Sequence, residues 1–291
     1  MRRLLAASLL LATPVLAQDR PVIVADSYPV AWMAEELAGD AAEVQLVVPE
    51  GRDPASWQPG LGEIVAIQEA DLIVLNGSGL ADWTTRAALP RARTVDTGRG
   101  LKDALIATET ITHSHGGEGS HSHEGKASHT WLDLEIAARQ AATLATALAR
   151  SLPDVDVEAR LADLQEQLSE LNATGDALVT GDPIAAIASH PRYEYLGAAY
   201  GLDVTSLDWE AGVAPDADQL AALDALAAET GAQMLIWETE PPAEARDAVA
   251  ERGLEQVVIP PLSMPPADGD FAETMRTSFD ALGAALAKIG Q

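Results

Sequence analysis

Cysteine is absent from the 291 residues, and basic residues are scarce. Without thiols the chain forms no disulfide, offers no thiolate to a metal ion and has no cysteine that could carry an N-terminal lipid. Only 18 Lys and Arg stand against 45 Asp and Glu, which gives a formal net charge of −27. So acidic a surface repels nucleic acid and anionic lipid head groups and attracts cations. The same charge is also explained by solubility alone, so it supports cation binding without establishing it.

Long hydrophobic runs are also missing, because no later stretch reaches 18 uninterrupted apolar residues. The N-terminus reads MRRLLAASLLLATPVLAQ: Arg2 and Arg3 precede the apolar stretch 4–12, and Val15-Leu-Ala17 is typical of a cleavage site. This pattern predicts a secretory signal peptide rather than a membrane-spanning helix. We therefore expect a soluble, monomeric protein that is free in the periplasm.

Short apolar strands alternate with segments of helical period along both halves of the chain. Strands are predicted at residues 22–25, 43–48, 71–75, 183–187, 202–207, 234–237 and 256–259, and helices at 28–37, 64–69, 218–229, 244–252 and 271–289. Such alternation is typical of parallel βαβ units with right-handed crossovers. The sequence therefore predicts an α/β fold of two lobes, each a mostly parallel sheet flanked by helices.

A helical segment separates the two halves. Residues 132–149 and 157–179 are rich in Ala, Leu, Glu and Gln, with apolar residues every three to four positions, and they predict one long helix or a kinked pair. The expected division is a signal peptide at 1–17, a first lobe at 18–131, a long bridging helix at 132–180 and a second lobe at 181–291. The first lobe includes a histidine-rich loop at 113–126.

Four of the six histidines lie within that loop, in the stretch HSHGGEGSHSH: His113, His115, His121 and His123. Neutral imidazole is a preferred ligand of zinc, copper and nickel. Each His-x-His pair can chelate one ion, because alternate residues of an extended segment share a face. Two other interpretations remain open, namely a scavenging buffer without a fixed site and a neutral low-complexity insertion.

Three further candidate ligands come from three separate segments. His190 follows the strand 183–187, Glu238 follows the strand 234–237, and His129 lies where the loop meets the bridging helix. Ligands of open α/β sheets bind outside the carboxyl ends of the strands, so we expect these three side chains at a metal site in the cleft between the lobes. A structural, hydrogen-bonded His190 and a helix-capping Glu238 are the alternatives.

Taken together, four motifs resemble those of the periplasmic zinc- and manganese-binding proteins of ABC importers. They are V-P-E-G-R-D-P at 48–54, A-D-L-I-V-L-N-G at 70–77, H-T-W-L-D at 129–133, and Ser189-His190 followed by Tyr195 and Y-G-L at 200–202. The resemblance covers nearly the whole mature chain. It implies a C-clamp fold, in which one rigid helix joins two α/β lobes and a metal ion is captured between them.

Two positions depart from the family pattern. The family usually has a histidine directly after the Asp-Pro turn, where this chain has Ala55, and often an Asp before a late Pro-Leu, where this chain has Pro260. His129 and His190 are thus the two family ligand positions that match. Because zinc takes four ligands, we hypothesise that the histidine loop and Glu238 supply the others.

The resulting prediction is a binding protein that captures zinc and delivers it to an ABC permease in the inner membrane. Nitrogen donors favour zinc over manganese, while copper and nickel are less favoured alternatives. A periplasmic zinc-buffering protein or metallochaperone that is not tied to import is the alternative function. An enzyme is not expected: no His-Glu-x-x-His motif occurs, and the Asp-Pro and Ser-His-Pro turns are interpreted as scaffold.

Overall fold

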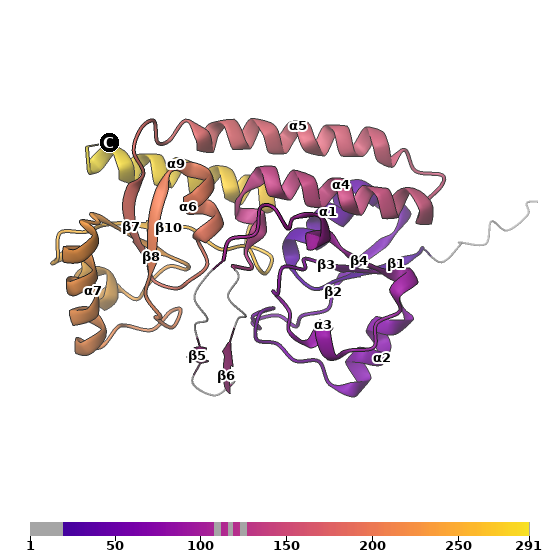
Figure 1. The fold of residues 1–291 in the computed structure, drawn as a ribbon, viewed down its shortest axis with the longest axis horizontal. Helices are drawn as coiled ribbons and strands as arrows, with labels where there is room; N and C mark the ends of the chain where they lie inside the picture. Colours follow the sequence, from indigo (N-terminus) through magenta and orange to yellow (C-terminus); the bar gives the residue numbers. More distant parts are fainter. Residues whose placement is uncertain (1–19, 108–111, 116–118, 123–126, 291) are drawn as a thin grey trace, which may run out of the picture.

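Two four-stranded parallel β-sheets form the centres of two lobes (Figure 1). The computed structural model describes residues 20–107, 112–115, 119–122 and 127–290. The first sheet has the order β2-β1-β3-β4 and the second the order β10-β9-β7-β8. Their strands are β1 (Val22–Ala25), β2 (Glu43–Leu46), β3 (Leu72–Leu75), β4 (Thr94–Asp96), β7 (Ile184–Ala188), β8 (Leu202–Ser206), β9 (Met234–Trp237) and β10 (Glu255–Val258). This arrangement confirms the predicted fold class.

Buried apolar runs account for the central strands. All four residues of β3 and of β9 are buried, as expected for strands that are covered on both faces. The helices of the first lobe are α1 (Tyr28–Ala38), α2 (Leu61–Glu69) and α3 (Trp83–Arg86), and those of the second are α6 (Glu194–Tyr200), α7 (Ala217–Thr230), α8 (Ala243–Ala250) and α9 (Phe271–Lys288). Short 3-10 turns occupy Gly39–Ala41, Arg91–Arg93, Thr97–Gly100 and, as η4, Thr130–Leu132.

The bridging segment is a helical hairpin. It consists of α4 (Leu134–Ser151) and α5 (Val157–Asp176), which contact each other along their lengths (Figure 1). Asp133 caps α4 by accepting hydrogen bonds from two backbone N–H groups, and Asp156 caps α5 by accepting one, from the N–H of Ala159. Pro153 follows the end of α4, where it separates the two helices. Of the two possibilities that the sequence left open, the chain therefore adopts the pair of helices.

Helix α5 is the element that links the lobes. It contacts α1 of the first lobe and α6 and α9 of the second. Near its end the backbone comes close to the second lobe: a Cβ on Gly175 would lie 2.5 Å from the ring of Tyr200 and 2.9 Å from that of Phe279. Only glycine fits there without displacing these rings. The close approach fixes α5 against the second lobe.

Apolar contacts also join the lobes directly. The largest cluster of buried apolar side chains includes residues of both sheets and of α1, α4, α5 and α9. Within it, Trp32 of α1 stacks on Phe271 of α9 with 4.7 Å between ring centroids. The shared core favours a fixed arrangement of the lobes over free hinge motion.

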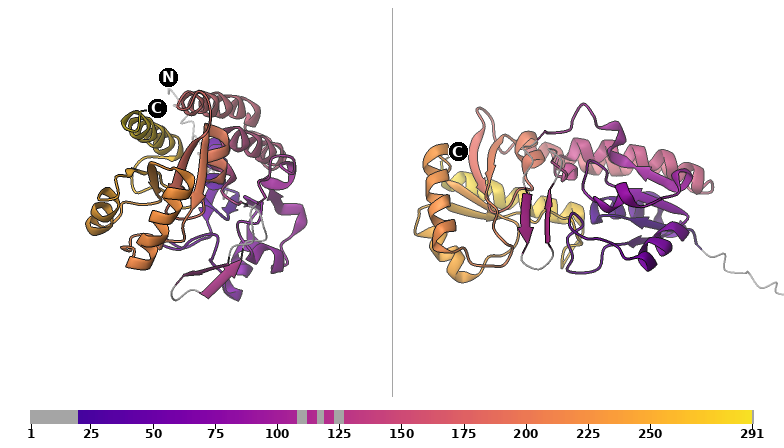
Figure 2. Two further views of the ribbon diagram at one scale, coloured as in Figure 1. Left: turned by 60° about the vertical axis from the view of Figure 1, so that its left-hand side comes forward. Right: turned by 60° about the horizontal axis from the view of Figure 1, so that its bottom comes forward.

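The histidine-rich segment contributes a short hairpin of β5 (Thr112–His115) and β6 (Gly119–Ser122). In Figure 1 and in the right-hand view of Figure 2 it lies between the two lobes, and Figure 1 shows it on the side opposite α5. Among the described residues, no helix combines the length and the apolar character needed to cross a membrane.

Candidate functional site

A cavity of about 380 Å³ lies between the two lobes. Asp53, in the loop after β2, lines it from the first lobe, and Arg192 and Glu238 line it from the second. Glu238 directly follows β9, and Arg192 lies four residues after the end of β7. The cavity therefore opens at the carboxyl ends of the strands, which is where ligands of α/β sheets bind.

His129 is fixed in this cleft by the residues on either side of it. The amide nitrogen of Asn76, at the end of β3, donates to the carbonyl of Ser128 at 3.1 Å, and Thr130 donates its hydroxyl hydrogen to the Asn76 side-chain oxygen at 3.1 Å. From the second lobe, the Pro261 carbonyl accepts a 2.7 Å hydrogen bond from the indole N–H of Trp131. Both lobes thus hold the segment that carries His129.

The imidazole of His129 is 3% exposed, and both of its nitrogens face polar atoms. Its Nε2 lies 3.0 Å from Nη1 of Arg192, and its Nδ1 lies 3.3 Å from the hydroxyl of Ser128. A guanidinium can only donate, so Nε2 must be the accepting nitrogen and Nδ1 carries the proton of the neutral ring. The lone pair of His129 therefore points at Arg192, which lines the cavity.

Arg192 is the centre of this group of side chains. Besides His129, it donates from Nη2 to Oδ2 of Asp53 at 2.7 Å and from Nε to Oε2 of Glu238 at 2.7 Å. Asp53 precedes it by 139 positions in the sequence. One guanidinium therefore connects a carboxylate of the first lobe, a carboxylate of the second and the histidine between them.

The electrostatics of the pair follow from burial and charge. Burial alone would raise the pKa of the Asp53 carboxyl, but the charge and hydrogen bond of Arg192 hold that pKa well below its usual range. Burial likewise disfavours a charged Arg192, yet Asp53 and Glu238 together raise its pKa above the usual value. Both Asp53 and Arg192 are therefore charged at neutral pH.

His190 lies just beyond the end of β7, as its position in the sequence predicts. It is 4% exposed, and its Nδ1 lies 3.2 Å from the carbonyl oxygen of Trp209 and 3.5 Å from a carboxylate oxygen of Asp208. Since a carbonyl oxygen only accepts, Nδ1 donates and the lone pair of the neutral ring is on Nε2. Fixing one ring nitrogen in this way is how proteins orient metal-binding histidines.

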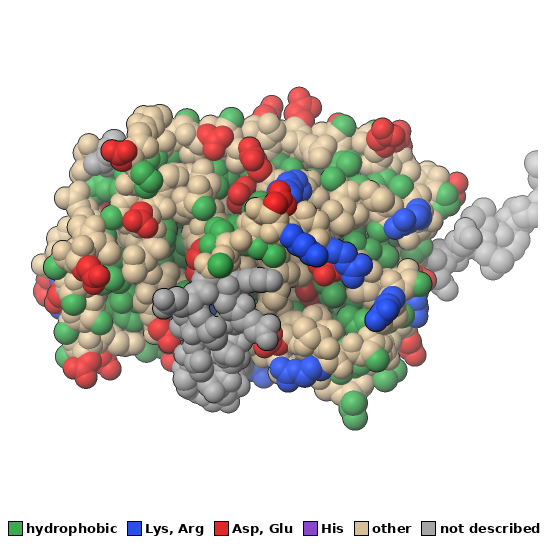
Figure 3. All heavy atoms as spheres, viewed as in Figure 1, with side chains coloured by type: hydrophobic (Ala, Val, Ile, Leu, Met, Phe, Trp, Pro, Cys, Tyr) green, Lys and Arg blue, Asp and Glu red, His purple; other side chains and the backbone are tan. Residues whose placement is uncertain are grey.

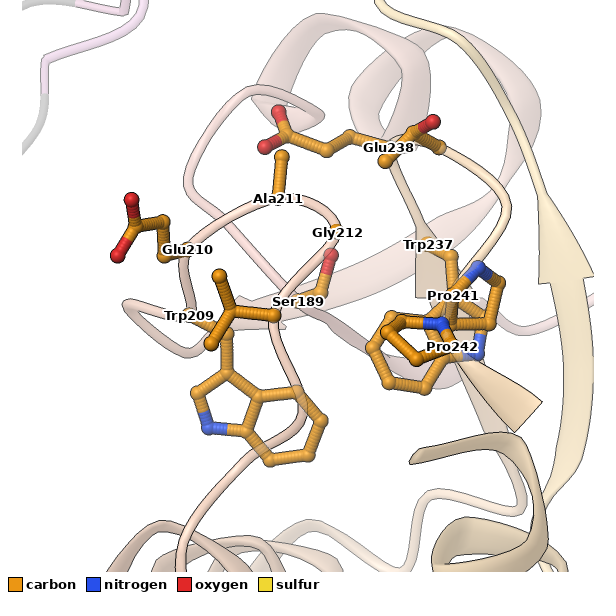
Figure 4. Close-up of a pocket in the computed structure, with 11 residues that line it drawn as sticks. Ser189, Trp209, Glu210, Ala211, Gly212, Trp237, Glu238, Pro241 and Pro242 are labelled. Carbon is orange, nitrogen blue, oxygen red and sulfur yellow. The ribbon is translucent and has the colours of Figure 1, made fainter. Parts of the chain in front are cut away.

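Glu238 extends from the end of β9 toward the loop that follows β8. In the close-up its carboxylate reaches over Ala211, while the indoles of Trp209 and Trp237 lie on the other side of that loop (Figure 4). The side chain is 11% exposed. Its strongest described partner is the guanidinium of Arg192, rather than the N-terminus of a helix.

The loop histidines are placed only in part. His113 and His115 lie in β5 and His121 in β6, where the antiparallel register pairs His113 with His121. Their side chains, and the whole of His123, lie outside the described residues, as does the predicted signal peptide at 1–17.

On the face shown in Figure 3, basic side chains gather over the first lobe in an otherwise acidic protein.

Among the residues that the structure describes, no three His, Asp or Glu side chains are already gathered as a metal-binding group. Instead, Arg192 lies among His129, Asp53 and Glu238. The sequence analysis missed both Arg192 and the role of Asp53, whose turn it interpreted as scaffold. Asp53 does form that turn, because its Oδ1 accepts the N–H of Ala55 at 3.0 Å, but its other oxygen pairs with Arg192.

A second buried carboxyl, that of Asp26, lies at the end of β1. It is 2% exposed, and its Oδ1 accepts hydrogen bonds from the Asn76 N–H at 2.9 Å and the Ser27 hydroxyl at 3.1 Å. Burial nevertheless raises its pKa from 3.8 to about 7. The folded protein thus keeps a proton that the unfolded chain releases above pH 3.8.

This difference predicts that the free energy of unfolding decreases as the pH rises from 4 to 7, because ionised Asp26 is disfavoured only in the folded state. For each pH unit in that range, the free energy of unfolding should fall by at most about 1.4 kcal/mol. Asp26→Asn, which retains the accepting oxygen, should stabilise the protein by a few times that amount (~2–4 kcal/mol) at pH 8 and flatten the profile. Urea unfolding at pH 5 and pH 8 measures the free energy of unfolding of the wild type and of this variant. The exposed Asp163→Asn is the control. Equal stability of the two variants at pH 8 would contradict a destabilising, ionised Asp26.

Comparison with known proteins gives consistent matches. The family model described as the periplasmic component A of the zinc-uptake complex, ZnuA, matches residues 23–285. The zinc-binding lipoprotein AdcA of Streptococcus pneumoniae is 28% identical over 209 residues, which are 69% of this chain and 40% of AdcA. The high-affinity zinc uptake system protein ZnuA of Bacillus subtilis is 25% identical over 244 residues, 80% of this chain and 75% of that protein. The manganese-binding lipoprotein MntA of Halalkalibacterium halodurans is 28% identical over 182 residues, 60% of this chain and 56% of MntA.

Solved structures share the fold. The metal-dependent lipoprotein YcdH from Bacillus subtilis superimposes with a TM-score of 0.76 at 21% identity, covering 91% of this chain and 99% of YcdH. Zn(II)-bound AdcA from Streptococcus pneumoniae superimposes with a TM-score of 0.75 at 21% identity, covering 92% of this chain and 58% of AdcA. This chain therefore spans less than two thirds of the length of AdcA, 40% of it in the sequence match and 58% in the structural match.

Proposed function

This chain belongs to the family of the periplasmic component A of zinc-uptake complexes, and on that basis we propose that it captures a divalent metal ion, zinc foremost, between its two lobes. Relatives are named for zinc and, in one case, for manganese. Imidazole nitrogen favours zinc, whereas manganese prefers sites built from oxygen donors alone. The two buried histidines of this chain therefore favour zinc.

One observation carries the proposal. The buried His129 directs its Nε2 toward a group that also contains the carboxylates of Asp53 and Glu238. Imidazole and carboxylate are the donors that zinc takes from proteins without cysteine. The same group combines residues of both lobes, as expected for a protein that binds its cargo between them.

The proposed ligands are His129 and His190, with further donors from Glu238 and from the histidine loop (His113, His115, His121 and His123). His190 is supported by the hydrogen bond that leaves its lone pair on Nε2. Glu238 is supported by its place at the end of β9, beside the cleft. The loop is supported by the hairpin β5–β6, which projects between the lobes (Figure 2).

We further propose that the protein acts in the periplasm as a monomer and delivers the metal to an ABC permease of the inner membrane. Binding needs no covalent chemistry, and the roles assigned to these residues are those of ligands rather than catalysts. A buffering or metallochaperone role, in which the recipient is another soluble protein, would use the same cleft and differs only in the partner.

Two measurements test this proposal. Calorimetric titration of the metal-free protein should show tight binding of zinc and weaker binding of manganese. Deletion of the gene should prevent growth on medium depleted of zinc by a chelator, and added zinc should restore it. Absence of zinc binding would contradict the proposed function; zinc binding with normal growth but altered loading of periplasmic metalloenzymes would favour the metallochaperone.

A further inference from the structure

We propose that Arg192 is a resident cation of the cleft, which holds the metal-free site together and which an arriving metal ion must displace. This inference rests on the proposed function and deepens it. It concerns what occupies the cleft before the metal arrives, and it assigns the metal affinity of the site partly to a residue that is not a ligand.

The partners of Arg192 are the reason for the inference. Its three nitrogens contact the Nε2 of His129 and one carboxylate oxygen each of Asp53 and Glu238. Two of these atoms belong to proposed ligands of the metal, His129 and Glu238. Because the lone pair of His129 Nε2 accepts from Arg192, it cannot bind a metal at the same time. Guanidinium and metal therefore compete for the same donor.

Burial makes this competition costly for the metal. The side chain of Arg192 is 10% exposed, and those of Glu238 and Asp53 are 11% and 25% exposed. Charged hydrogen bonds that are largely removed from water are stronger than ion pairs at the surface. Arg192 also joins the lobes, since Asp53 belongs to the first and Glu238 to the second. Binding of a metal ion must therefore release more free energy than the loss of these contacts costs.

The structure also offers a place for the displaced side chain. The cavity of about 380 Å³ that Arg192 lines continues along Thr239 and the segment 260–266. A long, unbranched side chain can swing into such a space without moving the backbone. Displacement therefore requires a change of rotamer and no opening of the lobes, which agrees with their shared apolar core.

The inference predicts that loss of Arg192 increases the affinity for zinc. Removing Arg192 leaves the two carboxylates facing His129 without a cation, so the metal-free state becomes less stable and the site more attractive to zinc. Arg192→Gln and Arg192→Met should both bind zinc at least about tenfold more tightly than the wild type, given the strength of close charge pairs. A residue with only a structural role would weaken binding when it is replaced.

Calorimetric titration with zinc and, separately, with manganese tests this, using the full chain and circular dichroism to check that each variant is folded. Arg192→Lys keeps the charge but lacks the planar fork, so its affinity should lie between those of the wild type and Arg192→Gln. Arg252→Gln is the matched control. It breaks the pair of Arg252 with Asp224 in the second lobe, away from the cleft, and should leave zinc affinity unchanged.

The possible outcomes separate the two proposals. Tighter binding by both uncharged variants than by a wild type that binds zinc, with the control unchanged, supports the inference. Equal or weaker binding by folded Arg192→Gln and Arg192→Met, with a wild type that binds zinc, overturns the inference and leaves the proposed function intact. Absence of binding by the wild type and all variants overturns the proposed function itself.

Discussion

Replacing His129 by alanine is expected to weaken zinc binding by more than about 100-fold, since loss of even an outer partner of a metal ligand costs about 10- to 100-fold. Its Nε2 is a buried nitrogen directed at Arg192, which also holds the carboxylates of Asp53 and Glu238. Competition with a chelating fluorophore measures the affinity. His190→Ala should have an effect of the same size, because a four-ligand site loses a nitrogen donor in either variant.

Two controls accompany this prediction. Ser128→Ala removes only the hydroxyl near Nδ1 of His129, so it should weaken binding less than His129→Ala does. Thermal unfolding in the presence of a chelator should show that each variant remains folded. Zinc affinity of folded His129→Ala within threefold of the wild type would contradict a role for this residue as a ligand.

Replacing the four loop histidines, His113, His115, His121 and His123, by serine is expected to abolish tight zinc binding as well. Zinc takes four ligands, and this chain lacks a histidine after the Asp-Pro turn, where Ala55 stands, and a late carboxylate, where Pro260 stands. The reduction should exceed about 100-fold if the loop supplies two donors to the site. Serine keeps the length and polarity of the loop, so titration measures the histidines alone.

Deletion of residues 113–123 is the comparison variant and should behave in the same way. A loop that only scavenges metal would give a different result: the serine variant would bind fewer zinc ions but retain the affinity of the tight site. Unchanged affinity in both variants would show that the loop contributes no ligand.

Much of the fold could be predicted from local patterns. The strands β1, β3 and β9 are short apolar runs that end in polar or turn residues, and each forms where the pattern indicates. Several short elements were missed: α3, the hairpin strands β5 and β6, β4 and α6. The strand β4 has only three half-buried residues, and α6 is a seven-residue helix, so neither is long enough to show a clear period.

The break between α4 and α5 shows where local patterns reach their limit. Apolar residues recur at helical spacing on both sides of 152–156, so the period alone does not distinguish a continuous helix from a hairpin. Pro153 and the capping Asp156 mark the break locally, and packing fixes the hairpin: α4 and α5 bury facing residues such as Leu144, Leu148 and Leu168 in the common core. Only these tertiary contacts leave no signal in a short stretch of sequence.

The part of the candidate site that lies at the ends of strands could be predicted from the sequence. His190 and Glu238 could be placed because the carboxyl ends of parallel strands meet at one edge of a sheet. The pair of Asp53 and Arg192 could not, because 139 positions separate the two residues and neither motif reveals a partner. A basic residue close to a strand end, in so acidic a chain, was the one available signal.

Crystallography of the zinc-loaded protein, with anomalous scattering measured at the zinc edge, tests the central claim most directly. We expect one strong anomalous peak within bonding distance, about 2.0–2.1 Å, of Nε2 of both His129 and His190, with the guanidinium of Arg192 moved away from His129. A peak bound to surface residues or to the loop alone, or imidazoles of His129 and His190 too far apart to share one ion, would contradict capture of the metal between the lobes.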